Sequence, residues 1–505
     1  MQFNSFIFIL CFLPLSLIGY FELNNLGKKK LAQAFLLIMS LWFYGYFNVS
    51  YLLIICGSIT ANYLLSKAMV SDGRSDSTKK AILNIGIVFN VALIFYFKYY
   101  DFFISNVNAA FKTDFVLRHI TLPLGISFFT FQQISFIVDS YKGETKDYSF
   151  MEYALFVAYF PQLVAGPIVL HSELIPQFRD KGKKSLDFDN LSKGIMLFSR
   201  GLAKKVLIAD TFGTAVTWGF NNAQVFTGDE ALSIYEIVIV MLSYTFQIYF
   251  DFSGYSDMAT GLGSMFNFHI PMNFNSPYKA LSVADFWKRW HMTLTRFLTQ
   301  YIYIPLGGNR KGAARTYINI MIVFLVSGIW HGANWTFILW GVIHGLGQCI
   351  NRMARGINQK ILEAAGRMGT FFVAAIKCIQ WAVTFAFVNV AWLLFRADSV
   401  GQWLSILKRF SVPYYEIRTE LLDCFRIPKL RYLFELLGAG NPDSVVLYFS
   451  LYSVLGMAFV LCLCFKNNYE RQYRKNALSL LFTLGILLIS VLSLSRISTF
   501  LYFNF

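Results

Sequence analysis

The run TYINIMIVFLVSGIWHGANWTFILWGVIHGLGQCI, residues 316–350, carries no formally charged residue, yet it holds two of the chain's six histidines, His331 and His344. Its two apolar halves, 316–330 and 335–350, are short, because a membrane-spanning helix needs about 20 apolar residues. The glycines and the asparagine around the first histidine favour a bend. The run therefore predicts two short membrane helices with a polar side chain held at the break between them.

The composition of the whole chain extends this prediction. Of its 505 residues, 56% are hydrophobic and 14% are charged, whereas soluble domains have about 25% charged residues. The net charge of +16 comes without any nucleic-acid motif, and cytoplasmic loops of membrane proteins collect Lys and Arg. The seven cysteines form no C-x-x-C pair, so we expect neither a disulfide framework nor a cysteine-based metal site.

Apolar stretches of spanning length recur along the chain. They fall near residues 4–22, 31–49, 51–70, 81–98, 120–139, 151–170, 233–250, 316–350, 370–395, 445–465 and 478–498. The first lacks the charged start and small-residue end of a signal peptide, so we expect it to be retained. The pattern predicts an all-α polytopic membrane protein with about 11 transmembrane helices, built as one membrane-embedded domain over residues 1–505.

Basic loops set the expected orientation. Lys and Arg cluster at residues 28–30, 67–80, 352–367 and 466–475. The positive-inside rule places these loops in the cytoplasm, and even numbers of crossings separate them when the halves 316–330 and 335–350 each cross once. Both termini and the mixed-charge loop at 396–444 are then expected outside, with the chain in the cytoplasmic (inner) membrane.

The middle of the chain is less regular. The segment that starts at Leu191 has apolar residues at helical spacing with basic residues between them, which predicts an amphipathic helix on the inner membrane surface. Residues 251–315 are rich in Gly, Asn, Ser and Trp and contain no clean span. Irregular backbone at membrane depth is tolerated only inside protein or beside a water-filled cavity. We therefore expect a site, with broken or re-entrant helices, in this region.

A second polar stretch, SVADFWKRWHMTLTRFLTQYIYIPLGGNRKG, begins at Ser282. Ser282 and Asp285 have the spacing of a capping box, so a helix is expected to begin here. Asp285 and Arg289 can pair on one face of that helix, while Trp290 and His291 fall on another. Each charge placed at mid-membrane costs about 2.5–3.5 kcal/mol, so such residues are functional candidates.

A purely structural interpretation of both stretches stays open. His331 would then bond a carbonyl near the interface, and Trp330, Trp335 and Trp340 would form an ordinary aromatic belt. The stretch from Ser282 would be a solvated interfacial helix. His344 is expected to be a packing residue.

Taken together, the motifs resemble the membrane-bound O-acyltransferase family. The motifs are D-F-W-x-R-W-H from Asp285, Y-I-P-L-G-G-N-R from Tyr303, G-x-W-H-G-A from Gly328, YTFQIYFDFSGYSDMATGLG at 244–263 and YFPQLVAGPIV at 159–169. The resemblance covers about residues 120–350 and is strongest to the bacterial branch typified by the alginate O-acetyltransferase membrane subunit.

This resemblance implies transfer of an acyl group to a hydroxyl, with His331 as the catalytic histidine and His291 as the second polar residue. A neutral imidazole near its ordinary pKa of about 6.5 can take a hydroxyl proton. The residues expected to support these two or to line a path are Trp290, Asp285, Arg289, Trp330, Asn334, Tyr249 and Asp251. Asn334, the Trp290 indole or backbone N–H groups beside Gly332 could stabilise the oxyanion.

The expected reaction moves an acyl group, with acetyl as the first expectation, toward an exported polysaccharide such as alginate. The expected donor is a cytoplasmic thioester such as acetyl-CoA or an acyl carrier. An extracytoplasmic acetyltransferase could complete the transfer, and a carrier protein is a possible further partner. No permanent cofactor, metal or nucleic acid is expected. Two alternatives within acyl transfer are D-alanylation of teichoic acid and O-acetylation of peptidoglycan. The alternative of another class is a multi-span transporter, since broken helices also mark transporters.

A donor inside and an acceptor outside require the acyl group to cross the protein. The sequence predicts a central tunnel lined by residues 244–263, 285–303 and 328–340 and open from the cytoplasm to His331. Aromatic walls would keep water from the acyl group. The small residues Gly254, Gly261 and Gly328 are expected to leave room for its passage.

Overall fold

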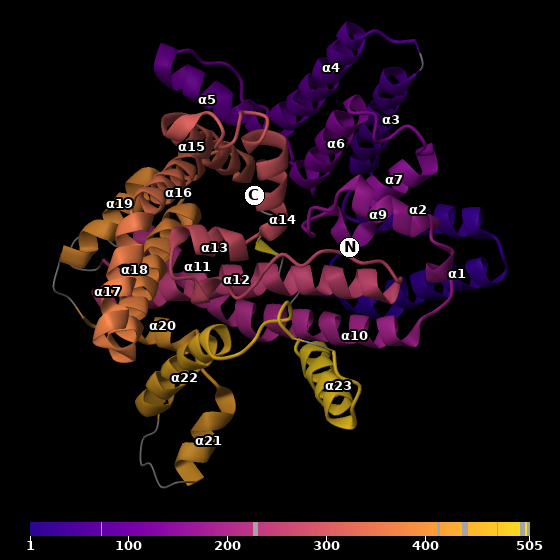
Figure 1. The fold of residues 1–505 in the computed structure, drawn as a ribbon. Coiled ribbons are helices and arrows are strands. Elements are labelled where there is room, and N and C mark those ends of the chain that lie inside the picture. Colours follow the sequence, from indigo (N-terminus) through magenta and orange to yellow (C-terminus); the bar gives the residue numbers. More distant parts are fainter. Residues whose placement is uncertain are drawn as a thin grey trace. The chain divides into compact units, whose positions relative to one another are not determined.

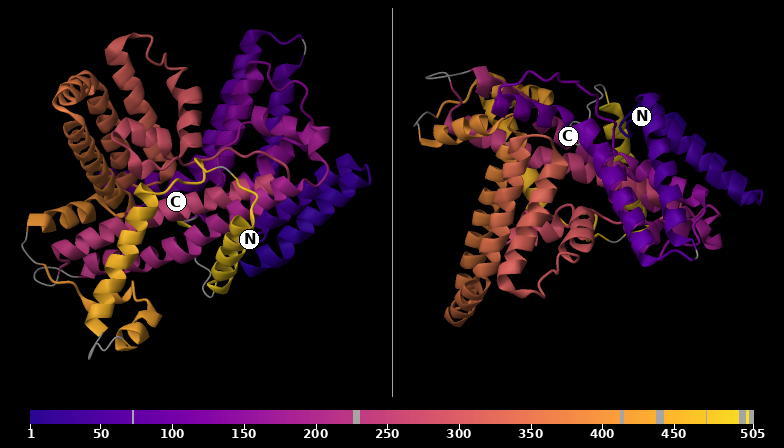
Figure 2. Two further views of the ribbon diagram at one scale, coloured as in Figure 1. Left: turned by 60° about the horizontal axis from the view of Figure 1, so that its bottom comes forward. Right: turned by 90° about the horizontal axis from the view of Figure 1, so that it is seen from above.

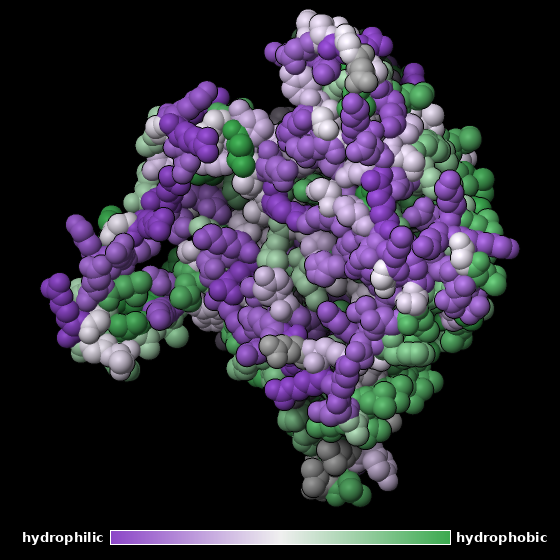
Figure 3. Space-filling view, turned by 45° about the vertical axis from the view of Figure 1, so that its right-hand side comes forward, coloured by the Kyte–Doolittle hydropathy of each residue, from purple (hydrophilic) through white to green (hydrophobic). Residues whose placement is uncertain are grey.

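The structure, a computed structural model, describes residues 1–71, 73–225, 231–411, 415–436, 443–471, 473–494 and 500–501. Within these ranges all regular structure is helical (Figures 1 and 2), which confirms the all-α prediction. Seven described helices are long and apolar enough to cross a membrane: Phe8–Asn25, Ser50–Val70, Asp76–Phe111, Ile234–Met265, Gly312–His331, Thr370–Arg396 and Asp443–Leu463. Large apolar side chains are exposed on many of these helices, as suits helices that face lipid. On the face drawn in Figure 3, hydrophobic residues lie mainly along the right-hand and lower margins.

The expected number of about 11 spans also includes helices outside these seven. Four further helices of 16 to 19 residues occupy predicted spans: α2 (Lys29–Gly45), α6 (Ile126–Tyr141), α16 (Trp335–Met353) and α23 (Ala477–Leu492), of which α23 is a short apolar helix. The predicted end of the last span, at 495–498, and the C-terminal residues 502–505 lie outside the described residues.

The predicted span at 151–170 is wrong. α7 (Phe150–Ala158) ends at Tyr159, whose ψ of 110° is not helical. α8 (Phe160–Leu163) has four residues, and α9 (His171–Arg179) packs against α7. Pro161 explains the break, because proline has no N–H to donate and its ring clashes with the preceding helical turn.

Two compact units are distinguished by their internal contacts. The first comprises residues 1–202, 255–272 and 473–505. Beside the helices already named it contains α1 (Leu13–Asn25), α3 (Ser50–Val70), α4 (Asp76–Ile94), α5 (Tyr100–Phe111) and α10 (Phe188–Ala203). α10 buries Met196, Leu197 and Phe198 and exposes Lys193, so it is amphipathic as predicted, whereas its place on the inner membrane surface stays a prediction. The single domain expected over residues 1–505 stays a prediction.

Buried amides hold three helices of the first unit together. Asn62 of α3 donates to Oε1 of Gln133 in α6 at 3.0 Å. Asn90 of α4 donates to Oδ1 of Asn62 at 2.6 Å. Ser58 adds a hydroxyl bond to Gln133 at 2.6 Å. Interhelical hydrogen bonds of this kind stabilise membrane helix packing, where burial of apolar surface supplies no driving force between helices.

The second unit comprises residues 203–254 and 273–472. Its helices are α11 (Asp210–Val225), the first part of α12 (Ile234–Met265), α13 (Val283–Arg289), α14 (Met292–Leu298), α15 (Gly312–His331), α16, α17 (Arg355–Met368), α18 (Thr370–Arg396), α19 (Val400–Lys408), α20 (Thr419–Asp423), α21 (Pro428–Leu436) and α22 (Asp443–Leu463). α15 and α16 form a tight hairpin and lie side by side (Figure 1).

Two glycines allow the two helices of this hairpin to approach each other closely. A Cβ added to Gly328 of α15 would lie 2.4 Å from the carbonyl oxygen of Phe337 in α16, and one added to Gly341 would lie 2.4 Å from the carbonyl oxygen of Phe324. Gly261, in the first unit, likewise lies against the carbonyl oxygen of Gly194, 2.6 Å from an added Cβ. Gly328 and Gly261 therefore serve helix packing, and the expectation that they leave room for an acyl group is wrong.

Helix α12 corrects a second expectation. The irregular region predicted from residue 251 begins only after Met265, because α12 is continuous over 32 residues. Its buried Asp251 is paired with Lys205, Nζ to Oδ1 2.7 Å, and Lys205 also binds Asp210 at 2.9 Å. This ion pair allows a carboxylate to lie inside an otherwise apolar helix face.

Candidate functional site

His331 is the last residue of α15, and it is 4% exposed. The backbone turns extended at Gly332, and α16 begins at Trp335 after the N-cap Asn334. The break predicted from the sequence is therefore confirmed. It leaves the imidazole at the end of one helix and beside the start of the next.

Aromatic rings surround His331 on several sides. Its ring centroid lies 4.9 Å from that of Trp330, 5.1 Å from Trp340 and 5.2 Å from Phe395 of α18. Trp340 is fully buried, so it is no part of an interfacial belt, whereas Trp335 is 56% exposed. These apolar walls limit the access of water to the imidazole.

His291 lies at a break that the sequence did not predict. The helix expected to run on from Ser282 ends at Arg289, and α14 starts at Met292. His291 between them has a φ of 45°, in the left-handed region that non-glycine residues seldom occupy. Strained backbone of this kind persists only where surrounding bonds fix it, and it is concentrated at functional sites.

Asn273 supplies those bonds. Its side-chain Oδ1 accepts from the backbone N–H of Thr293 at 3.1 Å and from the Thr293 hydroxyl at 2.8 Å. Nδ1 of His291 lies 3.2 Å from the same oxygen, and the N–H of Met292 donates to the Asn273 carbonyl at 3.0 Å. Because an amide oxygen only accepts, Nδ1 of His291 carries the proton and Nε2 of the neutral ring is an acceptor.

His291 and His331 both border the Trp330 indole, at centroid distances of 6.1 Å and 4.9 Å. His291 is fully buried in the junction between two short helices, outside the spanning helices. Burial lowers the pKa of His291 to about 3, because it penalises the charged ring. The ring is therefore neutral near pH 7. Its Nε2 can accept a hydrogen bond from a hydroxyl group, but it carries no proton to donate to a carbonyl oxygen.

Three of the predicted supporting residues, Trp290, Trp330 and Tyr249, belong to this cluster, and the other four serve elsewhere. Trp290 stacks near Tyr249, with centroids 6.3 Å apart, and lies 4.9 Å from Trp392. Trp392 lies 5.9 Å from Trp340, so a continuous aromatic wall links the two breaks. Phe395 extends this wall.

Asp285, Arg289, Asn334 and Asp251 have structural partners. Asp285 accepts from Nε of Arg289 at 2.8 Å, as predicted, and both side chains are about 30% exposed. Asn334 caps α16 by accepting from the N–H of Thr336 at 3.0 Å, and its amide donates to the Asp398 carbonyl at 3.0 Å. These roles make Asn334 a poor oxyanion donor.

Sequence reasoning missed Asn273, Trp392 and Phe395. Asn273 lies in the irregular segment after α12, and the aromatic pair lies on α18, more than 50 residues beyond His331. The sequence holds one signal for this pair. In NVAWLLFR, at the end of α18, a tryptophan and a phenylalanine lie three residues apart, which is the spacing of an aromatic face on a helix.

Three cavities meet at Lys288 of α13. One, of about 370 Å³, has mostly apolar walls and reaches the buried Ser327, four residues before His331 on α15. A second, of about 630 Å³, is polar and is lined by Lys288, Arg355 and Asp285 among others. The third, of about 520 Å³, extends to Arg296. The Lys288 side chain thus lines both the polar cavity and the apolar one.

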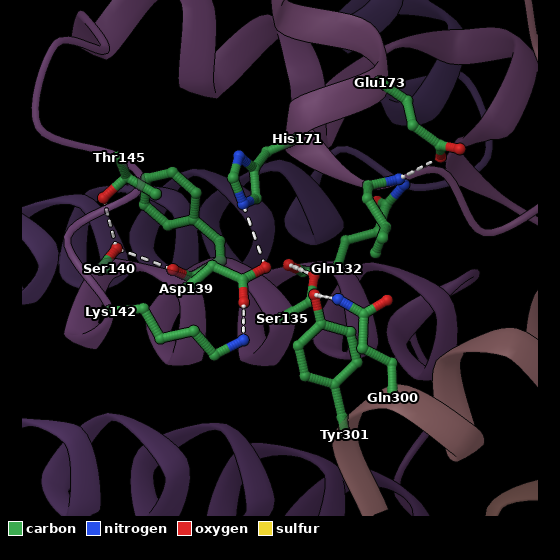
Figure 4. A network of polar contacts seen from close by, with 12 residues as sticks. Gln132, Ser135, Asp139, Ser140, Lys142, Thr145, His171, Glu173, Gln300 and Tyr301 are labelled. Carbon is green, nitrogen blue, oxygen red and sulfur yellow. Dashed lines mark hydrogen bonds and ion pairs between the residues drawn. The ribbon is translucent and has the colours of Figure 1, made fainter. Parts of the chain in front are cut away.

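A separate group of polar contacts lies around Asp139 and His171 of the first unit (Figure 4). His171 of α9 lies with Nε2 3.1 Å from Oδ2 of Asp139 and Nδ1 3.3 Å from the Tyr148 hydroxyl. Possible ligand atoms of Asp139, Glu144 and His171 lie within 4.8 Å of one another. However, the Lys142 ammonium already pairs with Asp139 at 2.6 Å, so this geometry indicates a loop-holding network and we assign no metal to it.

A sequence model of the membrane-bound O-acyltransferase family (MBOAT) matches residues 7–395, which is more of the chain than the 120–350 covered by the motifs. The match includes His291, His331 and the aromatic residues of α18 that face them.

Individual relatives differ in how much of the chain they match. The peptidoglycan O-acetyltransferase of Helicobacter pylori is 39% identical over 542 residues, covering 100% of this chain and 97% of its own length. The probable alginate O-acetylase AlgI of Pseudomonas aeruginosa is 38% identical over 441 residues, covering 84% and 80%. The teichoic acid D-alanyltransferase of Streptococcus thermophilus is 27% identical over 293 residues, covering 56% and 70%.

Proposed function

Because the chain belongs to the membrane-bound O-acyltransferase family and is a multi-pass membrane O-acyltransferase, we propose that it moves an acetyl group from a cytoplasmic thioester to hydroxyls of a glycan outside the membrane. The observation that carries this proposal is the position of His331, buried among three aromatic rings at the broken end of α15. The family favours this chemistry over the transporter alternative.

His331 acts as the general base. A hydroxyl is a weak nucleophile until its proton is removed, and a positioned base of this kind contributes about 10²–10⁴-fold. Removal of the proton in a site with apolar walls also keeps water from competing for the acyl group. His291, held by Asn273 with Nε2 as an acceptor, orients the incoming hydroxyl beside the same indole.

The donor is a thioester on a phosphate-bearing arm, either acetyl-CoA or a carrier protein. The polar cavity with Lys288 and Arg355 suits the phosphates, and the apolar cavity beside it suits the arm, since Lys288 lines both. Arg355 belongs to the basic segment expected in the cytoplasm. The tunnel to His331 and the inner-membrane location are part of this proposal.

The first candidate acceptor is peptidoglycan. The relative named for that acceptor matches the whole chain, including the part after residue 395 that the family model leaves out. An exported polysaccharide such as alginate is the second candidate, since two relatives named for alginate are 38% and 36% identical over about four-fifths of the chain. In either case an extracytoplasmic partner completes the transfer where the acceptor is too large to reach His331.

The test measures ester-linked acetate on purified peptidoglycan and, separately, on extracellular polysaccharide, in cells with and without the gene. Complementation uses the wild-type gene, His331→Ala, His291→Ala and, as a matched control, the exposed His119→Ala. We expect acetate on peptidoglycan to disappear without the gene and with His331→Ala, to fall strongly with His291→Ala, and to return with His119→Ala. Full acetylation with His331→Ala would overturn the catalytic assignment. Loss of acetate from the extracellular polysaccharide alone would show that the polysaccharide, and not peptidoglycan, is the acceptor.

A further inference from the structure

His344 of α16 is held in one tautomer. The Nε1–H of Trp287 in α13 donates to Nδ1 of His344 at 3.1 Å, and both side chains are buried. α13 packs against α16 (Figure 1). An indole nitrogen can only donate, so Nδ1 must accept, and the proton of the neutral imidazole is on Nε2. His344 therefore presents an N–H donor from Nε2.

Two buried donors on one face of α16 lack acceptors. Among the residues that the structure describes, neither Nε2 of His344 nor Nε1 of Trp340 has a hydrogen-bond partner. The two residues are four apart on the helix, and both are fully buried. Leaving a buried donor unsatisfied costs about 1–3 kcal/mol, so two neighbouring ones indicate an acceptor that the described part of the chain does not supply.

These donors lie beside the proposed base. The ring centroid of Trp340 is 4.6 Å from that of His344 and 5.1 Å from that of His331. The surrounding rings of Trp287, Trp392 and Phe387 offer indole N–H groups and ring faces but no conventional hydrogen-bond acceptor. A trapped water that accepted from both donors would still need acceptors for its own O–H groups, whereas a carbonyl oxygen needs only donors.

We propose that His344 and Trp340 donate to the carbonyl oxygen of the acyl group, as further catalytic residues of the transfer; this rests on the proposed function. His331 takes the proton of the acceptor hydroxyl, whose oxygen attacks the thioester carbonyl carbon. The C–O bond forms as the carbonyl electron pair moves onto its oxygen, where the two N–H groups stabilise the charge. The C–S bond then breaks, and the leaving thiolate takes the proton from the His331 imidazolium. His344 thus has a role beyond the packing expected from the sequence.

The test compares kcat and KM for acetyl transfer from acetyl-CoA in purified membranes of four variants. His344→Phe keeps the ring volume without a donor, and we expect kcat to fall about 100-fold with little change in KM, since one oxyanion donor is worth about 10²–10³ in kcat. His344→Gln should recover at least tenfold, because its amide can accept from Trp287 and still donate. Trp340→Phe should lower kcat similarly. Trp335→Phe, on the same helix but exposed, should match the wild type.

The results distinguish a failure of the donor role of His344 from a failure of the proposed acetyl transfer. His344→Phe within threefold of wild type, or no better activity in His344→Gln, overturns the donor role while an inactive His331→Ala leaves the proposed function standing. An active His331→Ala overturns both. If His344 only packs or holds a water, thermal unfolding midpoints in detergent fall for Phe and Gln alike and kcat per folded enzyme stays at wild type, which also overturns it.

Discussion

The side-chain oxygen of Asn273 lies 3.2 Å from Nδ1 of His291, on a backbone segment that precedes α13 by ten residues. The same oxygen accepts both the N–H and the hydroxyl of Thr293. One amide therefore starts α14, fixes the left-handed backbone of His291 and sets the tautomer of its ring. Second-sphere partners of this kind decide whether a catalytic side chain is held in its productive orientation.

Replacing Asn273 should thus damage catalysis more than binding. We expect Asn273→Ala to lower kcat about 10- to 100-fold, because His291 loses its orienting acceptor. Asn273→Asp keeps an oxygen for Thr293 and His291 and should stay within tenfold of wild type. Asn106→Ala, a partly buried asparagine in α5 that bonds a carbonyl of its own helix, is the control. Equal activity in Asn273→Ala and wild type would contradict the positioning role.

The sequence predicted the type of fold and the break at His331 well, because both depend on local composition. Long apolar runs predict helices in any membrane protein, and HGAN between two apolar halves can hardly continue a helix. The helix start predicted from Ser282 and Asp285 also depends on local sequence. It is confirmed by the hydrogen bond from the Asp285 N–H to the Ser282 hydroxyl at 3.1 Å.

What the sequence could not supply depends on contacts between distant segments. The break at His291 needs Asn273, and nothing in FWKRWHMTL signals that a helix would stop there. The span expected at 151–170 does not form, because the apolar composition of this segment does not override the helix-breaking effect of Pro161. The Gly, Asn, Ser and Trp content of residues 251–315 suggested irregular backbone from residue 251, whereas α12 continues to Met265 and a buried lysine 46 residues earlier neutralises Asp251 within it.

The α15–α16 hairpin should be sensitive to one methyl group. Gly328→Ala would place a Cβ 2.4 Å from a backbone carbonyl oxygen that cannot move aside, so we expect a loss of about 1–3 kcal/mol in stability and a lower unfolding midpoint in detergent. Gly356→Ala in α17, where an added Cβ meets nothing within 4 Å, should be neutral or stabilising. A Gly328→Ala protein as stable as wild type would show that the hairpin can open without cost.

The buried pair of Lys205 and Asp251 should show coupling. Both side chains are at most 3% exposed, and their charged atoms are 2.7 Å apart. Lys205→Met leaves a buried carboxylate without its cation, which costs about 3–5 kcal/mol. Lys205→Met/Asp251→Asn should recover a large part of that loss, because no buried charge remains at Asp251. Unfolding midpoints of the two singles and the double form the cycle, and simple additivity would contradict a direct pair.

The last prediction concerns the two ends of α18. This helix, Thr370–Arg396, has 27 residues, about 40 Å at 1.5 Å per residue, enough to cross a hydrocarbon core of about 30 Å. α17 before it exposes Arg355 and Lys360, so the positive-inside rule places α17 in the cytoplasm and α19 outside. In a background without native cysteines, Lys360→Cys should react with a membrane-impermeant maleimide only after the cells are permeabilised. Ser405→Cys in α19, also exposed, should react in intact cells. Labelling of both from the same side would mean that α18 does not cross the membrane, and reversed labelling would place the polar cavity at Arg355 outside, away from any cytoplasmic thioester.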